Sequence, residues 1–195
     1  MQHAAGPVRA GSFAIGCVVC LVAVHSLAAP ASGKPAANAR RLTWANTQSV
    51  FRIQKSENRN EVHYAIRVDA QCHPSGKQPV FGYWREFEKG PRAVSPLLSH
   101  EQPAYGLMPP RSVERTASGG RVRVSLRAFP ERLLTIEVQR AGTGCAARAL
   151  TTIHKQPAML NSIYVQIGFL FSVEYAIARG VRLPEGTPVQ EKLDD

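Results

Sequence analysis

The sequence predicts a mainly β fold: a single antiparallel meander barrel or sandwich of about 8-10 strands with one short helix. Two observations predict this class. Apolar and polar residues alternate along several short segments, as they do in strands with one buried face. Turn residues separate these segments at intervals of about eight to twelve residues. Because a closed or nearly closed meander removes exposed strand edges, we favour a barrel over a sandwich.

Residues 1–28 have the order of a secretory signal peptide. Arg9 precedes an apolar run, 12–27, and small residues stand at Ser26 and Ala28, the two positions that a signal peptidase reads. An uncleaved membrane anchor is the alternative, but a span needs roughly 20 apolar residues. We therefore expect cleavage after Ala28 and export to a bacterial periplasm or to the exterior.

The rest of the chain suits one domain. The protein has 195 residues and a formal net charge of +10, of which cleavage removes only Arg9. Residues 29–48 are rich in Ala, Pro, Ser, Gly and Asn and predict a flexible lead-in. Residues 49–195 are long enough to build one core, so we expect a single β-rich domain there.

Two cysteines, Cys72 and Cys145, remain after cleavage. An even pair in an exported chain predicts a disulfide, which would close a long loop and contribute about 4 kcal/mol. Two free thiols are the alternative. Two cysteines without paired histidines cannot fill a tetrahedral shell, so we expect no metal, and we expect no cofactor.

The first predicted elements form a hairpin. Residues 50–55 alternate, with Phe51 and Ile53 on one face, and 56–60 form a polar turn before a second strand at 61–69. The second strand separates two sets of side chains: Val62, Tyr64, Ile66 and Val68 on one face, and His63, Ala65, Arg67 and Asp69 on the other. This stretch gathers more potential chemistry than any other segment.

The middle of the chain changes character. A turn at 72–78 leads into an aromatic third strand at 79–88. Ser95, as an N-cap, and Pro96, at the first helical position, predict a helix of about two turns that ends before Pro103.

The last predicted elements return to the β pattern. The segment 121–128 alternates most clearly, with valines and a leucine facing in and arginines facing out. The remaining predictions are a weak strand at 113–116, a turn at 118–120, strands at 133–139, 145–153, 159–171 and 172–178, and an edge strand at 186–193.

The polar side of the first hairpin is the candidate binding site. Arg52 and Gln54 are the expected cross-strand neighbours of His63 and Arg67. Such a face suits a carboxylate or phosphate, because arginine offers a planar fork of donors. The candidate residues are Asn58, Arg59, Asn60, His63 and Arg67 at the polar end, with Tyr83 or Trp84 as an apolar wall. A solvated strand face with a capped turn is the alternative.

Three functions are compatible with these residues. We favour a non-enzymatic domain that binds an anionic or amphiphilic small molecule. A hydrolase would instead use His63 with Glu57, Glu61 or Asp69 as an acid–base pair, although the spacing selects none of them. The third is a pocketless protein attracted to an anionic envelope surface. The basic residues are scattered, without the aromatic and basic ladder of single-strand binders, so no specific nucleic acid is expected.

The chain resembles a bacterial family of exported domains of unknown function. Residues 50–64, VFRIQKSENRNEVHY, carry the resemblance with their Asn-Arg-Asn-x-Val-His-Tyr signature. Further similar features are 79–85, 104–106, Cys145 and 173–175. The resemblance implies an exported domain that begins near residue 50, and it implies no particular activity.

Overall fold

The computed structural model describes residues 46–169 and 173–193. The predicted signal peptide and the lead-in up to residue 45 lie outside the described residues. The first strand begins at Thr47, two residues before the predicted domain boundary at Ser49.

The described residues contain eleven strands, one 3-10 turn and one short helix. Their bounds are β1 Thr47–Lys55, β2 Glu61–Arg67, β3 Val80–Arg85, β4 Val94–Pro96, η1 Ser99–Glu101, α1 Gln102–Tyr105, β5 Ser112–Thr116, β6 Gly119–Leu126, β7 Phe129–Ala141, β8 Gly144–Ile153, β9 Gln156–Ile167, β10 Val173–Arg182 and β11 Pro188–Leu193. The predicted mainly β fold with a short helix is confirmed.

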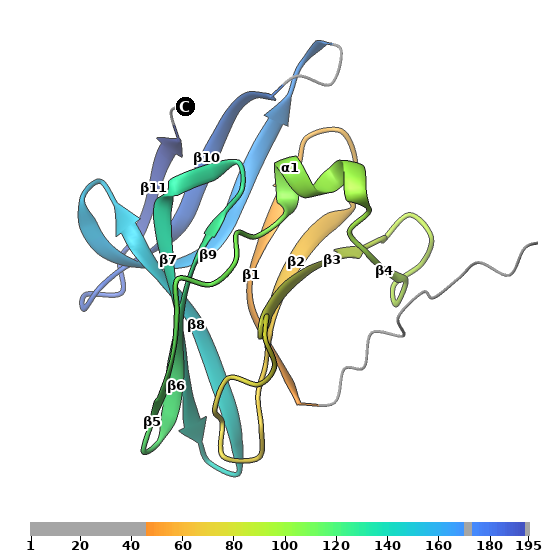
Figure 1. The fold of residues 1–195 in the computed structure, drawn as a ribbon. Helices are drawn as coiled ribbons and strands as arrows, with labels where there is room; N and C mark the ends of the chain where they lie inside the picture. Colours follow the sequence, from red (N-terminus) through yellow and green to blue (C-terminus); the bar gives the residue numbers. More distant parts are fainter. Residues whose placement is uncertain (1–45, 170–172, 194–195) are drawn as a thin grey trace, which may run out of the picture. The chain divides into compact units, whose positions relative to one another are not determined.

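All eleven strands belong to one sheet, in the order β4-β3-β2-β1-β9-β8-β7-β6-β5, with β10 paired to β9 and β11 paired to β10 (Figure 1). The sheet does not close into a barrel, because β4 and β5 end this path without pairing to each other. The preference for a closed or nearly closed barrel was therefore wrong, and the strands form one open sheet.

Strand β9 has three partners. Its first half, 156–160, pairs with β8, and its second half, 162–165, pairs with β1, while β10 lies along the other edge. The β1–β9 pairing is parallel, which corrects the prediction of a purely antiparallel sheet. A meander pairs neighbours in sequence, whereas this pair joins residues more than a hundred positions apart.

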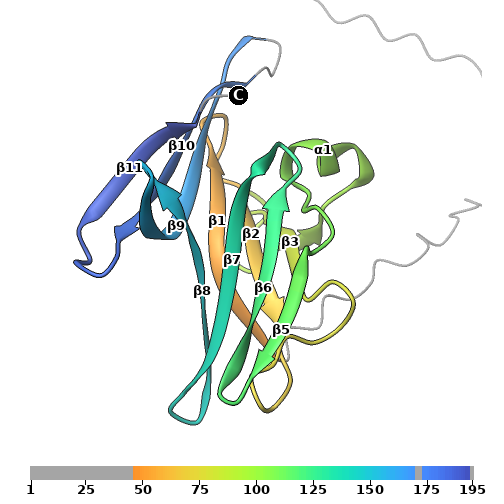
Figure 2. The ribbon, with the colours of Figure 1, turned by 60° about the vertical axis from the view of Figure 1, so that its left-hand side comes forward.

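The core lies between two parts of the sheet. Strands β1–β3 lie across from β6–β8 in both views (Figure 1, Figure 2). The buried side chains include Ile53, Tyr64 and Ile66 from the first part and Val122 and Ile136 from the second. The alternation read from the sequence is confirmed for both parts, since a period of two puts every second side chain on the buried face.

The helix differs from the prediction. Val94–Pro96 is the strand β4, and the helical turns begin three residues later, at Ser99. The N-cap is Leu98 rather than Ser95, and its backbone nitrogen donates to the Glu101 carboxylate at 2.7 Å. Pro103 lies within α1 rather than after it, because its missing N–H costs nothing in a first turn.

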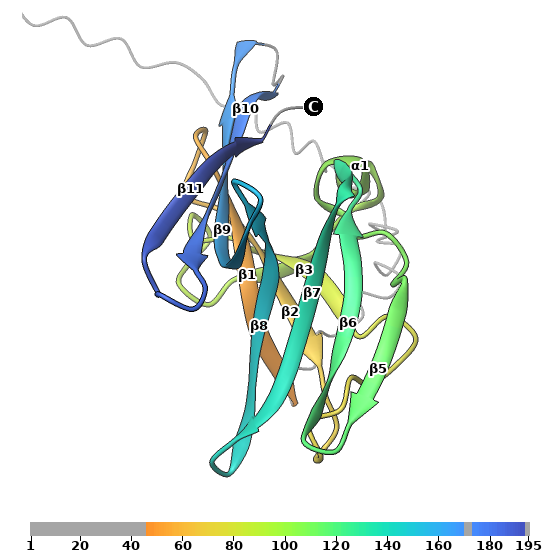
Figure 3. The same cartoon turned by 90° about the vertical axis from the view of Figure 1, so that its left-hand side faces the viewer.

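Helix α1 is joined to both parts of the sheet. The Tyr64 hydroxyl, fully buried on β2, donates to the Tyr105 carbonyl at 2.7 Å. The Arg127 backbone nitrogen donates to the Gly106 carbonyl at 2.9 Å. The helix therefore lies beside the turn between β6 and β7 (Figure 3).

Cys72 and Cys145 form the predicted disulfide, with Cα atoms 5.5 Å apart. Cys72 lies in the loop after β2, and Cys145 is the second residue of β8. The bond links a loop from one part of the sheet to a strand of the other.

Candidate functional site

The polar faces of the first three strands meet on the side of the sheet away from the core. The register places Arg52 opposite His63, and His63 opposite Tyr83. Gln54 lies opposite Glu61 in the next row. The predicted cross-strand placement is therefore confirmed for Arg52 and His63, whereas Gln54 lies opposite Glu61 and the partner of Arg67 is Thr47.

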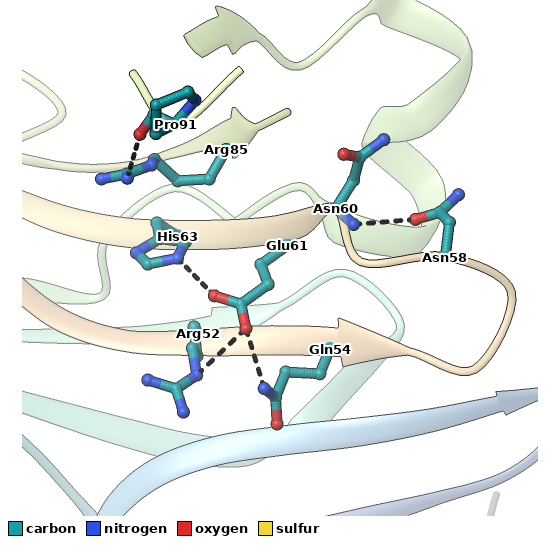
Figure 4. Close-up of polar contacts among 8 residues, drawn as sticks. All are labelled: Arg52, Gln54, Asn58, Asn60, Glu61, His63, Arg85 and Pro91. Atoms are coloured by element: carbon teal, nitrogen blue, oxygen red, sulfur yellow. Dashed lines mark hydrogen bonds and ion pairs between the residues drawn. The ribbon is translucent and has the colours of Figure 1, made fainter. Parts of the chain in front are cut away.

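Glu61 is the centre of this polar cluster. One carboxylate oxygen lies 3.5 Å from Arg52 Nε and accepts a hydrogen bond from Gln54 Nε2 at 2.8 Å. The other lies 2.7 Å from His63 Nε2 (Figure 4). Because an ionised carboxylate only accepts, Nε2 carries the proton and Nδ1 of a neutral His63 is left as an acceptor.

The half-buried position of His63 favours its neutral form. Burial lowers the pKa of His63 below its ordinary value of 6.5. The hydrogen bond and negative charge of Glu61 raise this pKa, and the positive charges of Arg85 and Arg52 lower it, so that the net shift is downward. Burial and the two arginines together therefore outweigh the effect of Glu61 on the pKa of His63.

Of the three carboxylates considered as partners of His63, the structure brings only Glu61 to it among the described residues. Glu57 accepts from Lys55 Nζ at 3.1 Å. Asp69 Oδ2 lies 3.3 Å from His73 Nδ1. Hydrogen bonds from the backbone nitrogens of the 69–73 loop, that of His73 first, hold the pKa of Asp69 below its ordinary value.

The turn between β1 and β2 is fixed by its two asparagines. Asn58 Oδ1 accepts from the Asn60 backbone nitrogen at 3.0 Å, an Asx turn that closes the loop on itself. The Asn60 side chain contacts Glu88, in the loop between β3 and β4. Arg59, between the asparagines, is exposed and has no hydrogen-bond or ion-pair partner among the described residues.

A groove of about 660 Å³ opens beside this turn. It is lined by Gln54, Lys55, Asn58, Arg59, Asn60, Glu61, Phe87, Pro91, Tyr164 and Arg179. The guanidinium of Arg179 lies over the Tyr164 ring, 5.1 Å from its centroid. The groove therefore has cationic groups on two sides and aromatic rings in its walls.

The other predicted site residues lie outside this groove. Tyr83 is buried on the same face of the sheet as His63, and their ring centroids are 5.8 Å apart. Arg67 lies over the Phe81 ring at 4.0 Å. Trp84 points to the core, where it meets Tyr105 edge-on at 5.4 Å. Tyr83 and Trp84, being consecutive on a strand, face opposite sides and cannot form one wall.

Sequence reasoning missed five residues of the groove: Lys55, Phe87, Pro91, Tyr164 and Arg179. Tyr164 enters because Gln54 pairs with it across the parallel β1–β9 contact. Arg179 lies one residue beyond the strand predicted to end at 178. The alternation of that strand, continued to Arg182 as observed, is the signal that places Arg179 on the outer face.

Within residues 46–169 and 173–193, no group of three or more His, Cys, Asp or Glu side chains is placed to hold a metal ion. In the same part of the chain, no helix has the length and hydropathy to cross a membrane.

These features define a small, disulfide-linked, mainly β domain with a polar groove at one turn. The family model described as Domain of unknown function (DUF4833) matches residues 51–192, well over half of the chain. The protein belongs to this family. No curated protein and no solved structure matches the chain.

Proposed function

We propose that this is an exported, non-enzymatic domain that binds an anionic small molecule in the groove beside the β1–β2 turn. The observation that carries the proposal is the pair of arginines that line the groove, Arg59 and Arg179. Arg59 has no hydrogen-bond or ion-pair partner among the described residues, and Arg179 has only the Tyr164 ring. Both guanidinium forks can therefore donate to a ligand.

The acidic residues near the groove do not cancel this charge. Glu61 is shared by Arg52, Gln54 and His63. Glu57 is held by Lys55. The charges left for a ligand are those of Arg59 and Arg179, so the groove favours an anion.

The aromatic side chains of the groove indicate the chemical nature of the uncharged part of the ligand. Phe87 and Tyr164 line the groove, and each ring already lies beside an arginine: Arg85 at 5.1 Å from Phe87, and Arg179 at 5.1 Å from Tyr164. Flat apolar walls with cations beside them suit a ring that carries a phosphate or carboxylate.

The binding experiment uses three probes: phenyl phosphate, inorganic phosphate and phenol. We expect phenyl phosphate to bind most tightly in isothermal titration calorimetry, because it alone meets both the arginines and the aromatic walls. Arg59→Ala and Arg179→Ala should each weaken it by about tenfold or more, the effect of losing a charge-assisted hydrogen bond.

The matched control is Arg115→Ala, since Arg115 is an exposed arginine that lines no part of the groove. Equal loss in all three variants would mean general attraction to a basic surface. Unchanged affinity in Arg59→Ala and Arg179→Ala would remove the groove as the site.

Export is the second part of the proposal. It is supported by the signal-peptide order of residues 1–28 and by the Cys72–Cys145 disulfide, since such bonds persist in oxidising compartments. Mass spectrometry of the protein from fractionated cells should find a chain that begins at residue 29 outside the cytoplasm. A full-length chain retained in the cytoplasm would contradict export.

A hydrolase remains a second candidate because the Glu61–His63 contact of 2.7 Å is observed. A lowered His63 pKa leaves the imidazole neutral and able to accept a proton near neutral pH. If the protein is a hydrolase, a panel of ester and phosphoester substrates will show turnover that is abolished in His63→Gln. In the unmodified protein this turnover will decrease at pH values below the pKa of His63. Turnover that is equal in His63→Gln would exclude this role.

A further inference from the structure

A second hollow, of about 780 Å³, lies on the outer face of β6–β8. It is lined by Arg121, Arg123, Ala128, Phe129, Pro130, Glu131, Arg132, Leu133, Thr135, Glu137, Leu150, Thr151 and Thr152. None of these residues lines the groove beside the β1–β2 turn. The two are separate candidate sites.

An irregularity between β6 and β7 builds one wall of this second hollow. Ser125 pairs with Leu133, but the next residue, Leu126, pairs with Phe129. One residue-to-residue step along β6 therefore corresponds to four along β7, and residues 130–132 of β7 have no paired residue on β6. Bulged residues bend a strand out of the sheet. Arg132 holds this bulge in place through the Thr152 carbonyl at 2.9 Å and Glu191 at 2.8 Å.

One row of charges on this face is internally satisfied. The register places Glu114, Arg121, Glu137 and Arg148 side by side on four adjacent strands, β5 to β8 (Figure 3). Glu137 lies 3.0 Å from Arg121 Nε and 2.8 Å from Arg148 Nη2. Because positive and negative side chains alternate along this row, it has little unpaired charge with which to bind a ligand.

The next row contains an arginine without a partner. Arg123 lies between Ser112 and Thr135, and Leu150 follows on β8. In the part of the chain that the structure describes, the exposed Arg123 side chain makes no hydrogen bond or ion pair. Beyond it the floor is apolar, with Leu133 and Leu150 half-buried.

We propose that this hollow binds a carboxylate with an apolar body. The carboxylate accepts from the Arg123 guanidinium, with the Thr135 hydroxyl beside it as a further donor. The apolar body covers Leu133 and Leu150 and ends against Phe129. Glu131 is also exposed in the wall, and its negative charge disfavours polyanions, which confines the ligand to a single charge.

The test compares octanoate with acetate and 1-octanol, followed by amide chemical shifts in two-dimensional NMR and by calorimetry. Acetate supplies the charge alone, and octanol supplies the chain alone. Octanoate should bind more tightly than either and shift the amides of β6–β8. Arg123→Ala should weaken octanoate binding by about tenfold or more, and Thr135→Val should weaken it less.

Two variants separate this proposal from the first one. Arg115→Ala, on the neighbouring strand β5 and outside the hollow, and Arg59→Ala, in the other groove, should both bind octanoate as the unmodified protein does. Octanoate that fails to bind at millimolar concentration, or that binds Arg123→Ala equally well, overturns the proposal. Equal affinity for acetate and octanoate would also overturn the proposal, because the apolar floor would then contribute nothing to binding. Retained melting temperatures show that each variant is folded.

Discussion

Asn60 and Glu88, 28 positions apart, are joined by two hydrogen bonds. The Glu88 backbone nitrogen donates to Asn60 Oδ1 at 3.2 Å, and Asn60 Nδ2 donates to Glu88 Oε2 at 3.3 Å. The pair ties the β1–β2 turn to the loop after β3. That loop supplies Phe87 and Pro91 to the groove, so the contact connects the turn to two further residues of the groove lining.

Replacing Asn60 with alanine should therefore affect both the loop and the ligand. We expect the free energy of unfolding to fall by about 1 kcal/mol, because two partly exposed hydrogen bonds are lost. Affinity for phenyl phosphate should fall as well, since Phe87 is no longer held in place. Chemical denaturation and calorimetry measure the two effects, and Asn161→Ala, an exposed asparagine on β9, is the control. A variant with full stability and full affinity would show that the contact fixes nothing.

Removing the Tyr64 hydroxyl tests the attachment of α1. Tyr64→Phe keeps the ring stacked on Phe51, 4.3 Å away, but leaves the Tyr105 carbonyl without its donor. We expect a loss of about 1 to 2 kcal/mol in unfolding free energy, because a partly buried carbonyl loses its hydrogen-bond donor. Tyr175→Phe, on the half-exposed outer face of β10, should cost much less. Equal effects in the two variants would contradict the assigned role of the hydroxyl.

The disulfide should account for a large part of the stability. Cys72 and Cys145 close a loop of 73 positions, for which the chain-entropy model gives about 4 kcal/mol. The double variant Cys72→Ser/Cys145→Ser should unfold at correspondingly lower denaturant concentration. A reducing agent should shift the unmodified protein by a similar amount and leave the double variant unchanged. If the reducing agent also changed the denaturant concentration at which the double variant unfolds, its effect would not come from the Cys72–Cys145 disulfide.

The pH dependence of stability should contain a contribution from His63. Its pKa is lowered in the folded state from 6.5, so below that value the unfolded chain binds the proton more readily than the folded one. Stability from this residue is thus present above about pH 6.5 and falls as the pH drops toward the lowered pKa. Denaturation curves between about pH 7.5 and 5 should show a smaller decline in His63→Gln. This range lies above the pKa of Asp69, which is lowered from 3.8 and would act only in more acid solution.

Local pattern was enough to predict most strands. The hairpin from Phe51 to Ile66 and the strand around Val124 follow from a period of two, which depends only on near neighbours. Placement of the turn before β6 was less accurate. Gly119 and Gly120 look like turn residues, but both lie in β6, and a side chain at Gly119 would collide with the Val138 carbonyl. Here glycine reflects a close approach of two strands rather than a turn.

The candidate site was predictable only in part. Asn58, Arg59 and Asn60 lie beside Glu61 in the groove lining because they share one hairpin with it. Tyr164 and Arg179 could not be predicted there, because Tyr164 reaches the groove through the parallel pairing of β9 with β1, and Arg179 through β10, which pairs with β9. The alternation of apolar and polar residues along a strand does not predict which distant strand will pair with its edge. That Tyr83 and Trp84 face opposite sides of β3 could have been predicted from the sequence, because consecutive residues of a strand alternate between its two faces.

The position of β9 has a consequence for how the protein is made. Since β1 and β8 both form hydrogen bonds with this one strand, neither half of the molecule is complete until β9, which ends at Ile167, has left the ribosome. A nascent chain shorter than that holds two unfinished sheets with bare edges, prone to stick to other chains. We expect folding to be slow, governed by the late synthesis of a single segment, and to leave the chain unfolded while it is still being synthesised.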